Sequence, residues 1–123
     1  MAGENILVVE DNVMNLKLVR ILLEQQEYIV TEALNAEEAL EILKYRHFDL
    51  ILMDIQLPKM DGLTLTKMLK EDPRTRDIPV VALTAHAMRG DEQKAQAAGC
   101  VGYIPKPIDT IEFPKLIEKF LRE

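Results

Sequence analysis

The stretch 49-DLILMDIQLPKMDGL-63 places a carboxylate at the end of an apolar run. Four apolar residues, 50–53, precede Asp54, and Pro58 and Gly62 follow it within a short segment. A short apolar run bounded by turn residues is typical of a strand that is buried on both faces of a parallel sheet. A carboxylate beside such a strand needs a compensating partner, because burial of an unpaired charge is costly. The stretch therefore predicts a buried strand with a site at its carboxyl end.

Four other apolar runs have the same character, and several of them are rich in Val and Ile. Together with the run above they give five predicted strands, at 6–9, 28–31, 48–53, 79–83 and 101–104. Each run is short enough for a strand, and helical patterns separate them. The chain is therefore expected to alternate strand and helix along its whole length.

Apolar residues recur at intervals of three and four in three of the segments between or after the strands. These residues are Leu16, Val19, Leu22 and Leu23; Ala36, Ala39, Leu40 and Leu43; and Phe113, Leu116, Ile117, Phe120 and Leu121. Asn35 and Asp109 are predicted N-caps, and Gly99 is predicted to end a helix. This alternation favours an α/β fold, a doubly wound parallel sheet with helices on both faces. In the strand order 2-1-3-4-5, a ligand is expected beyond the carboxyl ends of the first and third strands.

The composition is that of one soluble domain. Of the 123 residues, 48% are hydrophobic and 29% are charged, and a single domain is expected over residues 1–123. The net charge of −6 and the scattered basic residues argue against direct binding of nucleic acid. The sequence has no apolar run of roughly 20 residues and no signal peptide, so no membrane contact and a cytoplasmic location are expected. Cys100 belongs to no metal-binding motif and is expected to be a small buried side chain.

Polar side chains stand at the ends of four of the five predicted strands. They are Glu10 and Asp11 after the first strand, Asp54 at the third, Thr84 at the fourth and Lys106 after the fifth. If the first and third strands are neighbours, three carboxylates meet in one crevice. Each pair at ~4 Å repels by roughly 4 kcal/mol at an effective dielectric of about 20. Oxygen ligands with room for water suit Mg²⁺, so a magnesium site is expected there, with Lys106 supplying further positive charge.

This set of groups suits phosphoryl transfer. When a metal ion neutralises part of the negative charge, the Asp54 carboxylate can attack phosphorus and form an acyl phosphate. The Lys106 ammonium and the Thr84 hydroxyl, together with the ion, are donors for the three equatorial phosphoryl oxygens. Each residue also has an ordinary explanation: Asp11 as a helix cap, Asp54 as a turn residue and Lys106 as an exposed side chain. Their combination at four strand ends favours the functional explanation.

Four segments resemble the receiver domain of two-component response regulators, in the family's order and at about its spacing. They are ILVVEDNVMNLKLV, DLILMDIQLPKMDGL, IPVVALTA and GYIPKPI, and the resemblance covers nearly the whole chain. It implies a flavodoxin-like α/β fold. It also implies a phosphorelay protein that accepts a phosphoryl group on Asp54 from a histidine kinase or a histidine phosphotransfer protein. Such a protein promotes its own phosphotransfer and slow dephosphorylation and is not a turnover enzyme.

The resemblance assigns the acids to a metal site. Mg²⁺, for which Mn²⁺ can substitute, would be held by Asp11, Asp54 and the main-chain carbonyl of Gln56, with Glu10 assisting. Glu10–Asp11 replaces the family's more frequent Asp–Asp pair. Gln56 and His86 occupy positions that tune the lifetime of the phosphoryl group in this family.

The resemblance also implies a switch. Thr84 and Lys106 would bind the phosphoryl oxygens, and the Lys106–Pro107 bond would be cis. On phosphorylation Thr84 would move toward the phosphoryl group and the ring of Tyr103 would turn inward. An unknown downstream protein would bind the face made by the fourth helix, the fifth strand and the fifth helix. The ordinary alternative is that Tyr103 is a half-buried aromatic residue without a role.

Other interpretations stay open at this point. The sequence resembles single-domain cell-cycle regulators and also receivers excised from hybrid histidine kinases, and its start at Met1 and end at Glu123 favour the stand-alone protein. A haloacid-dehalogenase-type phosphatase also uses a strand-end aspartate and Mg²⁺, but it needs a second acid where this chain has Gln56. A flavodoxin-type cofactor carrier would need a phosphate-binding loop where this chain has EDN. A receiver-like module that is never phosphorylated would lack part of the acid set.

Overall fold

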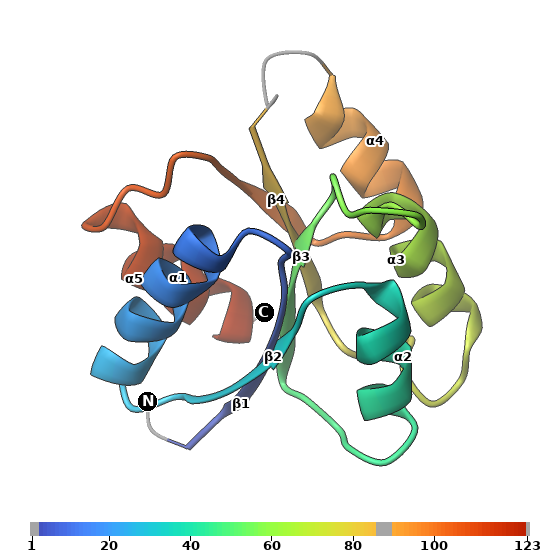
Figure 1. Cartoon of the computed structure of the whole chain (residues 1–123), viewed down its shortest axis with the longest axis horizontal. Helices are drawn as coiled ribbons and strands as arrows, with labels where there is room; N and C mark the ends of the chain where they lie inside the picture. Colours follow the sequence, from blue (N-terminus) through green and yellow to red (C-terminus); the bar gives the residue numbers. More distant parts are fainter. Residues whose placement is uncertain (1–2, 86–89, 123) are drawn as a thin grey trace.

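The structure is a computed structural model that describes residues 3–85 and 90–122. In this part of the chain, five strands alternate with five helices. The strands are β1 (Asn5–Val9), β2 (Ile29–Ala33), β3 (Leu50–Asp54), β4 (Val80–Thr84) and β5 (Gly102–Pro105). The helices are α1 (Val13–Gln25), α2 (Ala36–Leu43), α3 (Gly62–Glu71), α4 (Asp91–Ala98) and α5 (Glu112–Arg122). Figure 1 shows the strands in the middle of the fold, with helices on both sides.

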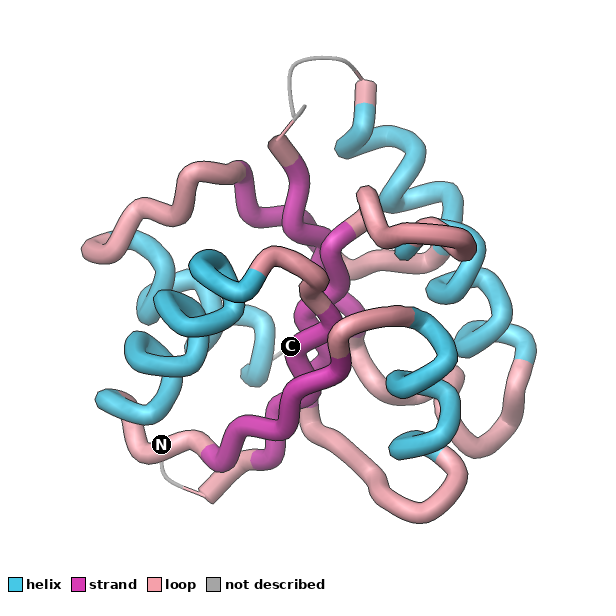
Figure 2. The backbone as a smooth tube through the Cα atoms, in the orientation of Figure 1, coloured by secondary structure: helices cyan, strands magenta, loops and turns pink. Residues whose placement is uncertain are grey.

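The strands form one parallel sheet in the order β2-β1-β3-β4-β5, which confirms the predicted flavodoxin-like topology. All five predicted strands are present, with ends shifted by one or two residues. Val9 pairs with Met53, and Asp54 pairs with Leu83, so the carboxyl ends of the central strands lie level with one another. Figure 2 shows these strands leading into loops at one end of the sheet. This arrangement brings the residues that follow β1, β3, β4 and β5 to one edge.

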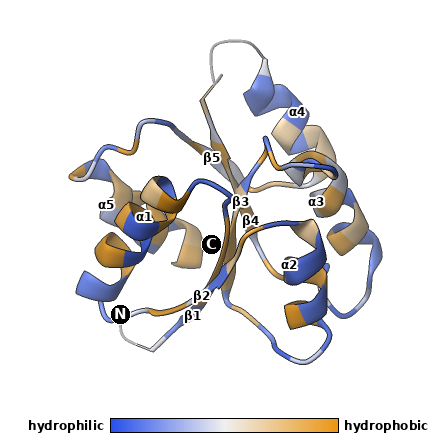
Figure 3. Ribbon diagram, in the orientation of Figure 1, coloured by the Kyte–Doolittle hydropathy of each residue, from blue (hydrophilic) through white to orange (hydrophobic). Residues whose placement is uncertain are grey.

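Each face of the sheet has its own apolar core, because successive strand residues point to opposite faces. Strand residues such as Ile6, Val8 and Leu52 pack against α1 and α5. Strand residues such as Leu7 and Met53 pack against α2, α3 and α4. Figure 3 shows hydrophobic strands between helices whose outer surfaces are largely hydrophilic. The helical faces predicted around residues 16–23, 36–43 and 113–121 are those that pack on the sheet.

Caps define the helix ends that the sequence predicted. Asn35 accepts a hydrogen bond from the main-chain N–H of Glu38 at 2.8 Å, and Asp109 accepts one from the N–H of Glu112 at 3.1 Å. Gly99 ends α4 with a φ of 112°, in the left-handed region that glycine adopts at little cost. Pro114 lies in the first turn of α5, where a main-chain N–H has no partner within the helix to lose.

Two helices had no periodic signature of their own in the sequence analysis. Helix α3 buries Leu65 and Leu69, and α4 buries only Ala95 and Ala98. Figure 3 shows α4 as a largely hydrophilic to neutral helix, in keeping with its sequence DEQKAQAA. Such a helix contributes little apolar area to the core. Cys100, which follows α4, is buried as expected.

The structure confirms that the Lys106–Pro107 bond is cis. This bond lies directly after β5, at the edge of the sheet that carries the polar strand ends. Among the described residues, we find no helix with the length and hydropathy required to cross a bilayer.

Gly62 provides a test of how the fold places Asp54. A Cβ atom at Gly62 would overlap the main-chain carbonyl oxygen of Asp54, so the start of α3 must approach β3 without a side chain. Gly62→Ala is expected to lower the free energy of unfolding by about 2–3 kcal/mol, measured by urea denaturation. Thr64→Ala, at an exposed position of the same helix, is the control and should change it by less than about 0.5 kcal/mol. Equal effects of the two substitutions would contradict this packing.

Candidate functional site

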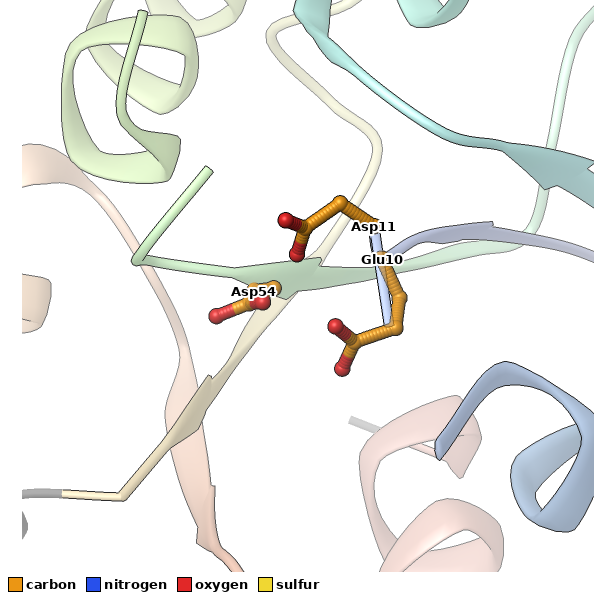
Figure 4. A group of neighbouring side chains, drawn as sticks. All are labelled: Glu10, Asp11 and Asp54. Atoms are coloured by element: carbon orange, nitrogen blue, oxygen red, sulfur yellow. The ribbon is translucent and has the colours of Figure 1, made fainter. Parts of the chain in front are cut away.

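Three carboxyl groups meet at the carboxyl ends of β1 and β3. Glu10, Asp11 and Asp54 each offer an oxygen within 4.8 Å of one another's. Figure 4 shows the three side chains turned toward one common space. Glu10 is held there by its main-chain N–H, which donates to the carbonyl oxygen of Ala33 on β2 at 3.0 Å. The juxtaposition predicted from the strand order is therefore present.

Lys106 lies among these acids. Its Nζ is 2.8 Å from Oε1 of Glu10 and 3.2 Å from Oδ2 of Asp54. Its main-chain N–H donates to the carbonyl oxygen of Thr84 at 2.7 Å, which fixes the chain after β5 against the end of β4. The side chain of Lys106 is 16% exposed, so the explanation of Lys106 as an ordinary exposed lysine is wrong.

Burial makes the charge on Glu10 costly. Glu10 is 0% exposed, and its Oε2 accepts a hydrogen bond from the N–H of Asn12 at 3.1 Å. Its Oε1 is close to Lys106 but lies outside hydrogen-bond geometry, so that contact is ionic in character. Burial, followed by the neighbouring Asp54 carboxyl group, raises the pKa of Glu10 to about 7. Burial alone would lower the pKa of Lys106, but its contacts with Glu10 and Asp54 outweigh burial and raise that pKa.

Asp54 is 3% exposed, and both of its carboxylate oxygens have partners. Oδ1 accepts a hydrogen bond from the main-chain N–H of Gln56 at 2.9 Å, and Oδ2 faces Lys106. The hydrogen bond from Gln56 is typical of a turn residue, and the contact with Lys106 is expected of a site residue. Asp54 therefore fits both the structural and the functional explanation. Gln56 itself is exposed. The role of its carbonyl oxygen as a metal ligand stays a prediction.

The helix after β1 shows that Asp11 is not its cap. Asn12 is the N-cap of α1, and its side chain accepts the main-chain N–H of Asn15 at 3.0 Å. The capping explanation of Asp11 is therefore wrong. The Asp11 side chain is exposed next to two buried carboxyl groups. It is in a position to reach both the site and bulk water.

Thr84 and Tyr103 were the predicted switch residues. Thr84 is buried at the end of β4, and its hydroxyl donates to Oδ2 of Asp91 at 2.8 Å. Sequence reasoning missed Asp91, because an acid in the first turn of a polar helix has no distinctive pattern. Tyr103 is half-buried and packs against the core beneath α2, α3 and α4. The prediction for His86 lies outside the described residues.

Tyr103 also lines a surface hollow of about 370 Å³ between α4, β5 and α5. Gln96 contributes from α4, and Leu116, Lys119 and Phe120 contribute from α5. The hollow therefore mixes apolar and charged groups on one face of the protein. It lies on the surface that the resemblance assigned to a downstream partner.

The acid set fits a divalent cation such as Mg²⁺. All three side chains offer oxygen atoms, which Mg²⁺ prefers, and the exposure of Asp11 leaves room for coordinated water. Oε1 of Glu10 is buried beside the site and is paired there with the Lys106 ammonium. One ammonium, paired with two of the three carboxyl groups, leaves negative charge uncompensated when all three are ionised. These three residues can therefore hold a metal ion.

Comparison with known proteins identifies the family. The response regulator receiver domain family matches residues 6–118, and the chain belongs to this family. The polar-differentiation response regulator DivK from Brucella ovis is 46% identical over 118 residues, which cover 96% of each chain. Two solved structures have the same fold. A proposed response regulator from Chloroflexus aurantiacus has a TM-score of 0.94 at 27% identity, covering 98% of this chain and 99% of that one.

The second structure is the receiver domain of a sensor histidine kinase from Pseudomonas aeruginosa. Its TM-score is 0.90 at 32% identity, and the match covers 99% of this chain and 100% of that one. That receiver has a magnesium ion coordinated in its active-site cleft.

The raised pKa of Glu10 predicts a pH dependence of stability in the metal-free protein. The unfolded chain holds this proton with a pKa of 4.5, and the folded protein holds it with a pKa of about 7. The stabilisation is therefore fully present below pH 4.5 and is lost as pH rises to about 7. Across this window the free energy of unfolding should fall by up to about 3 kcal/mol from this residue.

Urea denaturation in EDTA at several pH values measures this effect. Glu10→Gln keeps the shape of the side chain and removes the titration, so the wild type should lose more stability than the variant across the window. Glu71→Gln removes the same charge from an exposed position and is the matched control. If Glu10→Gln and wild type lose stability in parallel, Glu10 is not the buried titrating group.

Proposed function

We propose that this protein accepts a phosphoryl group on Asp54 from a phosphohistidine donor and signals through the resulting change of its surface. The observation that carries the proposal is the contact between a buried aspartate and a partly buried lysine beside two further acids. A buried strand-end carboxylate with an adjacent cation is suited to attack phosphorus. The 46% identity to the response regulator DivK supports the same function.

Each residue has a distinct part in the proposed transfer. An oxygen of Asp54 attacks phosphorus as the bond from phosphorus to the histidine nitrogen of the donor breaks, and an acyl phosphate forms. Lys106, which faces Asp54 at 3.2 Å, stabilises negative charge on a phosphoryl oxygen. Thr84 donates its hydroxyl to a second phosphoryl oxygen, and Tyr103 responds to that movement. Because the donor supplies the phosphoryl group and the protein retains it, this reaction is signalling rather than turnover.

We further propose that the metal is Mg²⁺, with Mn²⁺ as a substitute. Asp11, Asp54 and the carbonyl oxygen of Gln56 would hold the ion, and Glu10 would assist from its buried position. The ion, when bound, neutralises negative charge on the acids and on the phosphoryl oxygens. Support comes from the oxygen-only set of acids in this chain and from the receiver of the Pseudomonas kinase, which carries magnesium.

The single-domain interpretation of residues 1–123 belongs to the same proposal. The family match spans 6–118, and the five strands of one sheet are spread over Asn5–Pro105. Relatives of two kinds match, a response regulator at 46% identity and the receiver of a kinase at 32%. The higher identity supports a response regulator over a receiver excised from a kinase. The absence of an acid at Gln56 argues against the phosphatase alternative.

A protein donor needs a docking surface around Asp54. Val13 and Met14, at the start of α1, are 68% and 74% exposed, and Ile111, before α5, is 71% exposed. Both segments follow strand ends that carry site residues, and Figure 1 shows α1 and α5 on the same side of the sheet. Exposed apolar side chains near a reactive group favour contact with a protein partner. We propose that the histidine-bearing domain of the donor docks on these residues.

Phosphorylation of Asp54 can be tested with a small donor. Incubation with acetyl phosphate and Mg²⁺ is expected to add one phosphoryl group, measured by intact mass. Asp54→Asn should abolish the gain, because the nucleophilic oxygen is lost. Asp61→Asn, at an exposed helix cap, is the matched control and should be labelled like wild type. A gain of equal size in Asp54→Asn would place the acceptor elsewhere.

Docking can be separated from chemistry by a comparison of two donors. Met14→Ala is expected to slow transfer from a phosphorylated histidine phosphotransfer protein by roughly fivefold, because an exposed apolar contact is lost. Labelling by acetyl phosphate should stay unchanged, since a small donor needs no docking surface. Tyr45→Ala is the control, because Tyr45 is 80% exposed and lies before β3, at the other end of the sheet. Unchanged transfer from the protein donor, or equal slowing with both donors, would refute this docking surface.

A further inference from the structure

The hydrogen bond between Thr84 and Asp91 joins the end of the sheet to a helix. The Thr84 hydroxyl at the end of β4 donates to Oδ2 of Asp91, the first residue of α4, at 2.8 Å. A bond between a hydroxyl and a carboxylate is charge-assisted, and it is stronger than a bond between two neutral groups. Thr84 is also 2% exposed, so this bond satisfies a buried hydroxyl.

Helix α4 buries few side chains of its own. Its N-cap, Gly90, offers no side-chain cap bond, and the helix buries only Ala95 and Ala98. The small apolar area of two alanines holds a helix less firmly than the leucines and phenylalanines of α1 or α5. A polar bond at the first turn of α4 therefore has a comparatively large effect on the position of that turn.

The Thr84 hydroxyl carries one proton, so donation to one acceptor competes with donation to another. A phosphoryl group on Asp54 would offer strong acceptor oxygens at the same edge of the sheet. We propose that Asp91 is a positioning residue that acts through Thr84. It binds the hydroxyl in the unphosphorylated protein, and the start of α4 loses this bond when Thr84 donates to a phosphoryl oxygen. This inference rests on the proposed function and adds the competing acceptor to it.

The energetic consequence is specific. The bond to Asp91 stabilises only the unphosphorylated arrangement, so removal of the acceptor shifts the population toward the arrangement that binds a phosphoryl group. Asp91→Ala is therefore expected to tighten the binding of beryllofluoride, a phosphoryl analogue, at saturating Mg²⁺. The expected gain is about fivefold, which lies within the range for the net effect of one typical hydrogen bond.

The test is a double-mutant cycle on the whole chain, with the dissociation constant for beryllofluoride measured by NMR titration. Thr84→Val removes the donor, so Asp91→Ala should have no further effect in that background. Asp91→Asn keeps an acceptor oxygen and is expected to bind within about twofold of wild type. Glu92→Ala removes an acid from the same helical turn without touching Thr84, and it should bind like wild type. Asp91→Leu, which has nearly the shape of Asp but no acceptor oxygen, is a second variant should Asp91→Ala fail to fold by circular dichroism.

Each outcome decides between the possibilities. Unchanged or weaker binding in folded Asp91→Ala or Asp91→Leu would overturn the role of Asp91, and so would equal tightening in the Thr84→Val background. Wild-type binding of beryllofluoride together with phosphorylation of Asp54 would leave the proposed function standing in those cases. Failure of the wild type to bind would instead overturn the proposed function, and this inference with it.

Discussion

The ion pairs of Lys106 with Glu10 and Asp54 are the interaction on which the site depends. Three carboxyl groups lie within one small space, and repulsion among them would oppose the fold without a cation. Lys106 offsets part of that repulsion from β5, across the end of β4. Two processes can reduce the remaining excess of negative charge. One is protonation of Glu10, whose pKa is raised to about 7, and the other is binding of a divalent ion. The same excess of negative charge would therefore account both for the proposed metal binding and for the predicted sensitivity to pH.

The parallel sheet brings the site residues together through the register of its strands. Its registers bring the ends of β1, β3 and β4 level, so residues distant in sequence meet at one edge. The close approach of Gly62 to Asp54 and the cap at Asn12 then fix the loops that leave these ends. The sheet packs against an apolar core on each face, while α4 buries only two alanines of its own. In the proposed function, a local charge change at the site would be passed to the surface through such a helix.

The fold was predictable because strong apolar strands alternate with helices, and this pattern leaves few topologies. The grouping of Glu10, Asp11, Asp54 and Lys106 followed from the strand order alone. Helices α3 and α4 lack a clear apolar periodicity in the sequence. Helix α4 packs on the core with two alanines only.

The helix cap and the side-chain pairings that depend on exact contacts could not be predicted from the sequence. Asn12 rather than Asp11 caps α1, since the helix begins at Val13 and the Asn12 side chain accepts the N–H of Asn15. The direct pairing of Glu10 with Lys106, and of Thr84 with Asp91, depends on side-chain reach across loops. Neither pairing has a fixed spacing that a sequence pattern can reveal. These are also the contacts on which the proposed switch depends.

The central claim is that the acids at the ends of β1 and β3 bind one divalent cation. Paramagnetic Mn²⁺, added at substoichiometric amounts to ¹⁵N-labelled protein, tests this directly through the broadening of amide signals. The amides of Glu10, Asp11, Asp54 and Gln56 are expected to broaden first, and excess Mg²⁺ should restore them. Broadening centred on other acids, such as Glu37 and Glu38 at the start of α2, or spread evenly over the surface, would contradict the account.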